Sequence, residues 1–135
     1  MKNKMKAVTA LFFVVVLFAS CKKYPDGPSL TIRSRTSRVA NTWKVESATD
    51  NGTDITSFLS GYTETYAKDG TYSFVDGNTS GSGKWAFQTN DTEIKINGVS
   101  NQSSRTITIL KLKEKEFWYS YTDNGDSYVF HMIPN

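Results

Sequence analysis

The sequence predicts an all-β protein whose single domain is an eight-stranded antiparallel up-and-down β-barrel. After residue 40, short runs of alternating apolar and polar residues recur along the chain. Turn residues separate these runs at close intervals, and no long stretch has the spacing of an amphipathic helix. Consecutive strands joined by tight turns form a meander. Eight such strands close into a barrel whose interior is filled by side chains or holds one small ligand.

The expected strands follow one another through short connections. The first begins at residues 41–45 and is followed by a turn and by a short helical piece over 55–59, capped by Asp54. Polar stretches over 76–83 and 98–103 are expected to be loops, the first of them flexible and at a mouth of the barrel. The other seven strands are predicted at 62–67, 71–75, 84–88, 93–97, 104–113, 117–122 and 127–133.

The stretch from Tyr66 onward sets the register of the second and third strands. A three-residue turn that ends at Gly70 places Tyr66 opposite Tyr72 and Glu64 opposite Phe74. A two-residue turn would shift the pairing by one residue and scatter the aromatic side chains over both faces. The three-residue turn is therefore expected.

Three further features align the later strands. A four- or five-residue loop sets Trp85 near Ile96 in the next hairpin. A change of apolar face in the sixth strand predicts a β-bulge near Ile109–Leu110. Asn124-Gly125 is the strongest short hairpin signal in the chain. That hairpin aligns six large side chains on one inward face: Phe117, Tyr119, Tyr121, Tyr128, Phe130 and Met132.

The first residues of the chain predict export and lipid attachment. Three lysines precede an apolar run over 7–19, which is shorter than the about 20 residues of a membrane span and suits a secretory signal peptide. Phe18-Ala19-Ser20-Cys21 resembles the lipobox of bacterial lipoproteins. This resemblance implies cleavage before Cys21 and acylation of its thiol and of its new amino group. A plain signal peptide followed by an incidental cysteine is the alternative.

Two observations favour the lipobox. Cys21 is the only cysteine, so it has no partner for an internal disulfide. The stretch after it is polar and holds two prolines and a glycine, as expected of a tether. The chain is thus expected to comprise a cleaved signal peptide (1–20), a lipidated cysteine with a flexible tether (21–40) and the barrel (41–135), anchored to the outer membrane as a monomer.

The charge distribution speaks against nucleic acid as a partner. The whole chain has 16 basic and 13 acidic residues, but three of the basic residues and none of the acidic ones lie in the predicted signal peptide. The mature chain is therefore formally neutral and shows no basic face with a reading motif. The basic residues of the tether are expected near anionic membrane headgroups. They are Lys22, Lys23, Arg33, Arg35 and Arg38.

Four short motifs carry a resemblance to a known family. They are Trp43 on the first strand, the DGTY of 69–72, the GKW of 83–85 and a hairpin that sets Leu112 opposite Phe117. Together they are similar to the lipocalin-like lipoproteins common in Bacteroidota, over about residues 39–133. Asn41 stands where lipocalins usually have a glycine. The resemblance implies a small barrel attached to the cell envelope and implies little about a ligand.

Catalytic and metal-binding patterns are not found in the sequence. His131 is the single histidine, and it is expected on the outward face. No Gly-x-Ser-x-Gly elbow and no Cys/His cluster with metal spacing is present. The acidic turn at 123–126 lacks the length and the terminal glutamate of a calcium loop. The protein is therefore expected to be no enzyme and to carry neither a cofactor nor a metal.

The inward face supplies the candidate ligand-lining residues. They are Glu64, Tyr66, Tyr72, Phe74, Trp85, Arg105 and Tyr119. An inward carboxylate is costly unless it is paired, and Arg105 is a conceivable partner for Glu64. Glu64 is either a polar anchor for a ligand or a rim residue in water, and the rim position is favoured. The aromatic rings either line a pocket or fill the interior, and filling is slightly favoured.

Two functions remain open at this point, and an enzyme comes third because no nucleophile–base pair is found in the sequence. The first is a lipid-anchored barrel that binds a small hydrophobic or amphiphilic molecule. The second is a module with a filled core that mediates protein or glycan interaction through its loops or through an outward aromatic residue such as Trp118.

Overall fold

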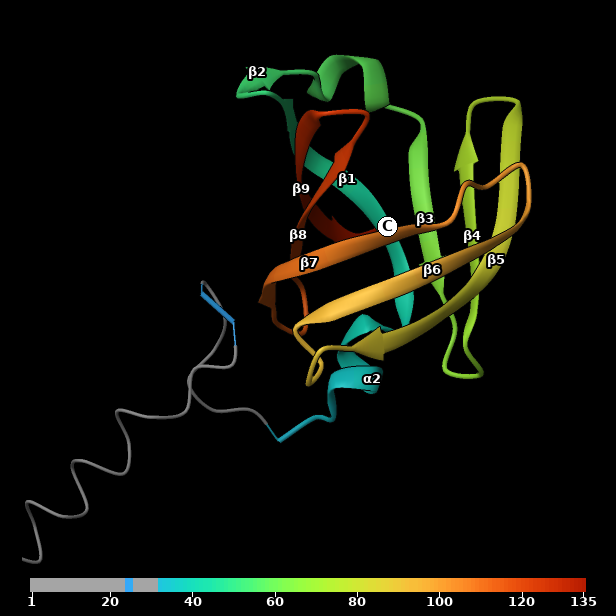
Figure 1. The fold of residues 1–135 in the computed structure, drawn as a ribbon, viewed down its shortest axis with the longest axis vertical. Coiled ribbons are helices and arrows are strands. Elements are labelled where there is room, and N and C mark those ends of the chain that lie inside the picture. The colour runs from blue at the N-terminus through green and yellow to red at the C-terminus, as the bar shows by residue number, and fades with distance from the viewer. Residues whose placement is uncertain (1–23, 26–31) are drawn as a thin grey trace, which may run out of the picture.

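The structure, a computed structural model, describes residues 24–25 and 32–135. The described elements are helix α2 (Arg35–Val39), the 3-10 helix η1 (Thr56–Leu59) and the strands of one antiparallel sheet (Figure 1). The strands are β1 (Asn41–Asp50), β2 (Thr53–Asp54), β3 (Tyr62–Tyr66), β4 (Thr71–Asp76), β5 (Thr79–Gln88), β6 (Glu93–Ser100), β7 (Arg105–Leu112), β8 (Phe117–Asp123) and β9 (Asp126–Pro134).

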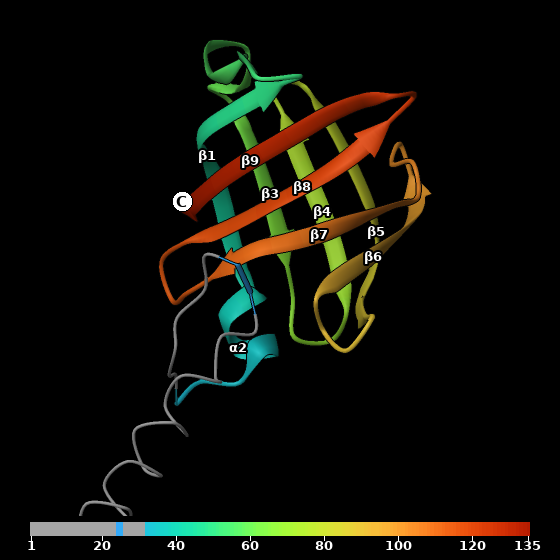
Figure 2. The same cartoon turned by 60° about the vertical axis from the view of Figure 1, so that its left-hand side comes forward.

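The sheet closes into a barrel. From β3 to β9, each strand pairs with the next one along the chain, and β1 pairs with both β3 and β9. Figures 1 and 2 show these strands wrapped around one interior. The predicted eight-stranded up-and-down barrel is therefore confirmed. The short strand β2 is an addition to it and pairs only with the end of β1.

The register of the second hairpin is the expected one. Tyr66 lies opposite Tyr72, and Glu64 lies opposite Phe74. Gly70 adopts a φ of 86°, a left-handed conformation that residues other than glycine rarely adopt. The three-residue turn is thus confirmed, and the aromatic residues of β3 and β4 share the inner face.

The other predicted pairings are also confirmed. Trp85 lies opposite Ile96, and the register of β7 against β8 shifts between Ile109 and Lys111, as a bulge requires. The Asn124-Gly125 turn joins β8 to β9 with Asp123 opposite Asp126. It pairs the six inward side chains as Phe117 with Met132, Tyr119 with Phe130 and Tyr121 with Tyr128.

The expectation of a flexible loop over 76–83 was wrong. Strands β4 and β5 continue to Asp76 and Thr79, so that a two-residue turn joins them. The glycine-rich stretch pairs with β4 and β6, and the ring of Phe74 lies over it: a Cβ on Gly81 would come within 2.3 Å of that ring. The expected loop over 98–103 is likewise shorter, since β6 extends to Ser100.

The barrel has two different ends, at the top and the bottom of Figure 1. We call the upper end the mouth; it comprises η1, the β4–β5 and β8–β9 turns and the β6–β7 connection. We call the lower end the base; it comprises α2 and the β3–β4, β5–β6 and β7–β8 turns. Near the mouth, the predicted helical piece is η1, and Asp54 accepts a hydrogen bond from the Thr56 backbone N–H at 2.8 Å.

Side chains fill the interior next to the base. The ring centroids of Trp43 and Phe117 lie 5.6 Å apart, and those of Tyr66 and Trp85 lie 5.8 Å apart. Each indole N–H donates to a backbone carbonyl at 2.8 Å, that of Trp43 to Val39 and that of Trp85 to Ala67. These large apolar side chains are buried with their polar atoms satisfied, so each contributes roughly 1.5–3 kcal/mol to folding.

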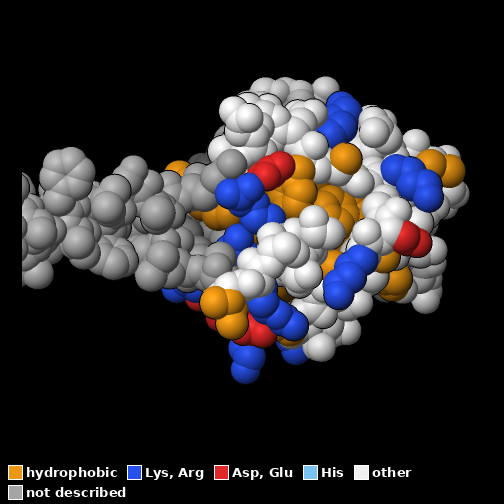
Figure 3. Space-filling model, turned by 90° about the horizontal axis from the view of Figure 1, so that it is seen from below, with side chains coloured by type: hydrophobic (Ala, Val, Ile, Leu, Met, Phe, Trp, Pro, Cys, Tyr) orange, Lys and Arg blue, Asp and Glu red, His pale blue; other side chains and the backbone are white. Residues whose placement is uncertain are grey.

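Two parts of the predicted tether pack onto the base. Ser34 caps α2 by accepting a hydrogen bond from the Ser37 backbone N–H, and Val39 at the end of the helix is fully buried. Tyr24 is also buried, with 2% of its surface exposed. Figure 3 looks onto the base and shows lysine and arginine side chains around apolar ones. The predicted signal peptide and Cys21 lie outside the described residues.

Among residues 24–25 and 32–135, no helix is both long enough and apolar enough to cross a membrane.

Candidate functional site

A buried carboxylate lies inside the barrel and collects hydrogen bonds from several strands. Glu64 is completely shielded from solvent. The Arg105 Nη2 donates to its Oε1 at 2.8 Å. Tyrosine hydroxyls donate to Oε1 from Tyr62 (2.7 Å), Tyr72 (3.0 Å) and Tyr119 (3.1 Å), and to Oε2 from Tyr66 (2.9 Å). We call these six residues the Glu64 cluster.

Strand alternation explains how the chain builds the cluster. Tyr62, Glu64 and Tyr66 are two residues apart on β3, so all three side chains point to the same face. The other donors reach across the interior from β4, from β8 and from the first residue of β7. The predicted pairing of Glu64 with Arg105 is confirmed. The favoured rim position of Glu64 was wrong, because five donors compensate for the loss of water around the carboxylate.

The electrostatics of the cluster favour one protonation state of its donors. Burial raises the pKa of the four tyrosine hydroxyls well above the ordinary value, and the charge of Glu64 raises it further. Burial alone would lower the pKa of Arg105, but Glu64 and the surrounding phenols raise it above the usual value for arginine. At neutral pH the phenols therefore remain hydrogen-bond donors and the guanidinium stays charged.

A cavity of about 360 Å³ opens at the mouth above this cluster. It lies between the ends of β3, β4 and β8 and the connection from β6 to β7. Its lining residues are Tyr62, Phe74, Asn101, Gln102, Ser103, Ser104, Arg105, Thr106, Tyr121, Thr122 and Asp123. Tyr62 and Arg105 belong to both the cavity and the Glu64 cluster, so the cluster forms the cavity floor.

Arg105 is held at that floor by hydrogen bonds from one nitrogen and by one aromatic ring. Within the described part of the chain, the hydrogen bonds of the Arg105 side chain all come from Nη2. The guanidinium carbon lies 4.7 Å from the centre of the Tyr121 ring. Its Nε is buried without a hydrogen-bond partner among those residues. The side chain is 21% exposed. A ligand in the cavity therefore meets a positioned cation between aromatic rings.

The predicted lining residues divide into three groups. Phe74 and Arg105 line the cavity. Glu64, Tyr66, Tyr72 and Tyr119 lie beneath it, where the three hydroxyls and Arg105 share the carboxylate of Glu64. Trp85 lies away from the cavity, near the base, where it packs against Tyr66 and Phe87. The interior is thus filled at one end, as the sequence favoured, and hollow at the other.

Several lining residues were not predicted. Tyr62 and Tyr121 were expected on the inner face, and their alternation with other rings was the signal that places them there. Residues 101–103 were expected only as a loop, and Ser104 as the start of the sixth strand. Nothing in the sequence of this segment indicates that it folds over the mouth, because that position follows from the closure of the barrel.

The outer wall carries a separate stack of side chains. The rings of Trp118 and His131 lie 3.8 Å apart and nearly parallel, as cross-strand neighbours on β8 and β9. The Lys111 Nζ lies 3.5 Å from the centre of the Trp118 ring. His131 therefore lies on the outward face, as expected, and it has no contact with the Glu64 cluster.

The described residues contain no group of three or more His, Cys, Asp or Glu side chains that is able to hold a metal ion. No protein-family model and no curated protein matches this chain.

Proposed function

We propose that the protein is a lipid-anchored barrel of the cell envelope that binds one small amphiphilic molecule in its mouth cavity. The observation that carries this proposal is the cavity of about 360 Å³ with Arg105 fixed at its floor. Small-molecule sites commonly have volumes of about 300–1,000 Å³ and a few positioned polar groups among apolar ones. The lipobox-like sequence before Cys21 supports the anchor, and the barrel fold is compatible with binding.

The lining of the cavity indicates the kind of ligand. Tyr62, Phe74 and Tyr121 offer ring faces to an apolar or planar group. The guanidinium of Arg105 offers donors to an acceptor such as a carbonyl or hydroxyl oxygen. Glu64 already neutralises Arg105, and Asp123 adds negative charge at the rim. A neutral or zwitterionic head group therefore fits better than a strongly anionic one.

Native mass spectrometry of the mature lipidated protein, purified gently from the cells that produce it, tests the proposal. Ser103 is exposed and lines the cavity, so Ser103→Trp should fill the space without disturbing the Glu64 cluster. Ser60→Trp is the matched control, since Ser60 is exposed but does not line the cavity. We expect a bound small molecule in the wild type and in Ser60→Trp, and none in Ser103→Trp. A bare wild-type protein would contradict the proposal.

The outer stack of Lys111, Trp118 and His131 favours a second candidate, namely protein or glycan binding on the wall of the barrel. Tryptophan is enriched at protein interfaces and among the residues that dominate binding energy. In that case Trp118→Ala would abolish binding to a glycan or protein array, while Ser103→Trp would leave it unchanged.

A further inference from the structure

Charged residues are segregated between the two ends of the barrel. The mouth carries acidic side chains on its strand ends and turns: Asp50, Asp54, Asp76, Asp123 and Asp126. The described connections at that end (51–61, 77–78, 101–104 and 124–125) contain no lysine or arginine. Arg105, the first residue of β7 at this end, is paired with Glu64. The cations gather at the base: Arg33, Arg35, Arg38, Lys68, Lys84, Lys113 and Lys115.

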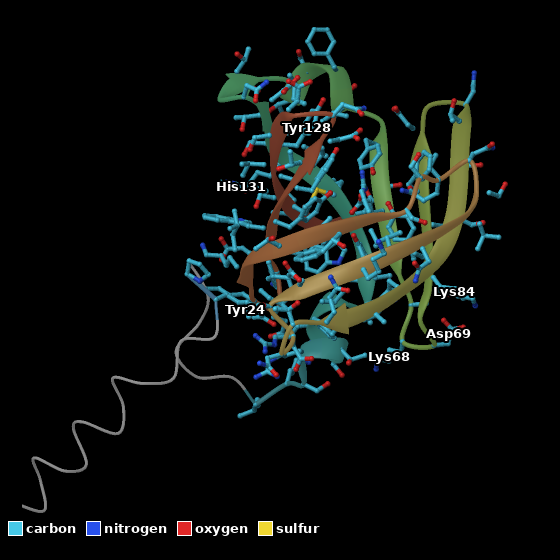
Figure 4. All side chains as sticks on the ribbon, in the orientation of Figure 1. Tyr24, Lys68, Asp69, Lys84, Tyr128 and His131 are labelled. Atoms are coloured by element: carbon cyan, nitrogen blue, oxygen red, sulfur yellow. The ribbon has the colours of Figure 1, made fainter. Side chains whose placement is uncertain are left out.

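The base also has acidic residues, but the cations outnumber them. Asp69, Asp91, Glu93, Glu114 and Glu116 lie at this end. Two of them form ion pairs with α2 and the residues before it, Glu114 with Arg33 and Asp91 with Arg35. Lys68, Lys84 and Lys115 are exposed. Figure 4 shows Tyr24, Lys68 and Lys84 toward the base and Tyr128 at the opposite end. The molecule is therefore electrically polarised along the barrel axis.

The chain reaches the base very close to the predicted lipid. Tyr24 is buried there, and Arg35, Arg38 and Asp91 influence the pKa of its hydroxyl, which burial raises. Cys21 precedes Tyr24 by three residues. Three extended residues span at most about 11 Å. A lipid on Cys21 therefore holds the base close to the bilayer surface. This distance is comparable to the Debye length, about 8 Å in physiological salt, over which charges still attract each other.

The surface of the base has the composition of an interfacial site. A groove of about 470 Å³ runs beside α2 and is lined by Arg33, Ser34, Arg35, Thr36, Arg38, Phe87 and Asp91. Ile32, next to this groove in the sequence, is fully exposed. Exposed apolar groups with neighbouring cations favour the boundary between anionic headgroups and acyl chains.

We propose that the base is a membrane-docking surface for a bilayer that contains anionic lipids, and that the mouth faces away from it. This inference rests on the lipid anchor of the proposed function. The anionic bilayer attracts the basic base and repels the acidic mouth, and both effects favour the same orientation of the barrel. The barrel is then held upright on the membrane, with the ligand cavity open to the aqueous side.

Spin labelling of the mature lipidated protein in vesicles tests this orientation. Acylation of Cys21 blocks its thiol, so one introduced cysteine takes the label. Ile32→Cys places the label at the base, and Ser127→Cys places it at the mouth. In vesicles of phosphatidylglycerol and phosphatidylcholine, we expect the label at 32 to collide more with lipid-soluble oxygen and several-fold less with a water-soluble nickel reagent than the label at 127.

Charge reversal separates docking from anchoring. Lys68→Glu with Lys115→Glu should return the label at 32 to water while the protein still floats with the vesicles. The matched single variants are Lys115→Glu at the base and Lys44→Glu on the outer wall of β1, where Lys44 pairs with Thr63. The first should weaken docking, and the second should leave it intact. If the wild-type protein floats but both labels are equally exposed to the nickel reagent, docking is overturned and the anchor stands. If it does not float and Cys21 takes up label, the anchor itself is overturned, and docking with it.

Discussion

The base and the mouth of this barrel use the same kinds of side chain in opposite ways. At the base, Trp43 and Trp85 are buried as apolar filling, and each indole N–H is satisfied by a nearby carbonyl. Toward the mouth, tyrosine rings also pack together, but their hydroxyls converge on the single carboxylate of Glu64. One end is stabilised by apolar burial and the other by a charged network. Removing a donor from such a network leaves a buried charge less well compensated.

This difference also explains where the cavity lies. At the base, the rings belong to no shared hydrogen-bond network and pack against one another. Around the Glu64 cluster, the hydroxyls fix the rings at hydrogen-bond distance from one carboxylate, so they are not free to close the space above Arg105. The cavity lies at the end where a polar network takes the place of apolar filling, and the two ends should respond differently to pH and to substitution.

The largest expected effect is alkaline loss of stability. Above about pH 10 the tyrosines of the unfolded chain lose protons, whereas Tyr66, Tyr72 and Tyr119 keep theirs because burial and Glu64 raise their pKa. The unfolded state then binds fewer protons, so the free energy of unfolding falls by about 4 kcal/mol per pH unit for these three groups. Below about pH 10 this stability is fully present. Urea unfolding across this range, with tyrosine absorbance, measures it; ionisation of all seven tyrosines before unfolding would contradict it.

Removing the cation of the cluster should have the next largest effect. Arg105→Met leaves the carboxylate of Glu64 buried without its charged partner and should lower the free energy of unfolding by about 3–5 kcal/mol. The double variant Glu64→Gln with Arg105→Met should recover part of the loss, because no net charge then remains buried. Urea unfolding at neutral pH compares the two. Equal stability of the single variant and the wild type would show that solvent already compensates Glu64.

A single hydroxyl should matter less. Tyr119→Phe removes one donor to Glu64 and should cost about 1.5–3 kcal/mol, the usual range for a hydrogen bond to a charged group. Tyr128→Phe is the matched control at the mouth, since Tyr128 makes no hydrogen bond to the cluster. It should change stability by less than about 0.5 kcal/mol. Thermal unfolding of both variants decides whether the network or ring packing stabilises the mouth.

The smallest effect is expected at the base. Ile94→Val removes one methylene group from a fully buried side chain and should cost about 0.5–1.5 kcal/mol. Because Ile94 has no part in the Glu64 cluster, the slope of stability against alkaline pH should equal that of the wild type. A changed slope would mean that the two ends are coupled more tightly than their separate contacts indicate.

The sequence by itself determined the barrel and most of its register. Asn124-Gly125 allows only one pairing of its flanking strands, and Gly70 sets Tyr66 opposite Tyr72. Both signals are local, because a turn fixes which residues face each other across a hairpin. The sequence failed at 76–83, where polar and glycine-rich composition indicated a loop. The strand there pairs with β4, and the ring of Phe74 from that neighbouring strand lies over Gly81.

Only the tertiary structure decided the candidate site. Alternation placed Glu64 on the inner face and suggested Arg105 as its partner, but the depth of Glu64 depends on closure between β1 and β9. Tyr119 is separated from Glu64 by 55 residues, and only closure brings its hydroxyl to that carboxylate. Local patterns specify the face on which a side chain lies. How far it lies from water is set by what the rest of the chain places around it.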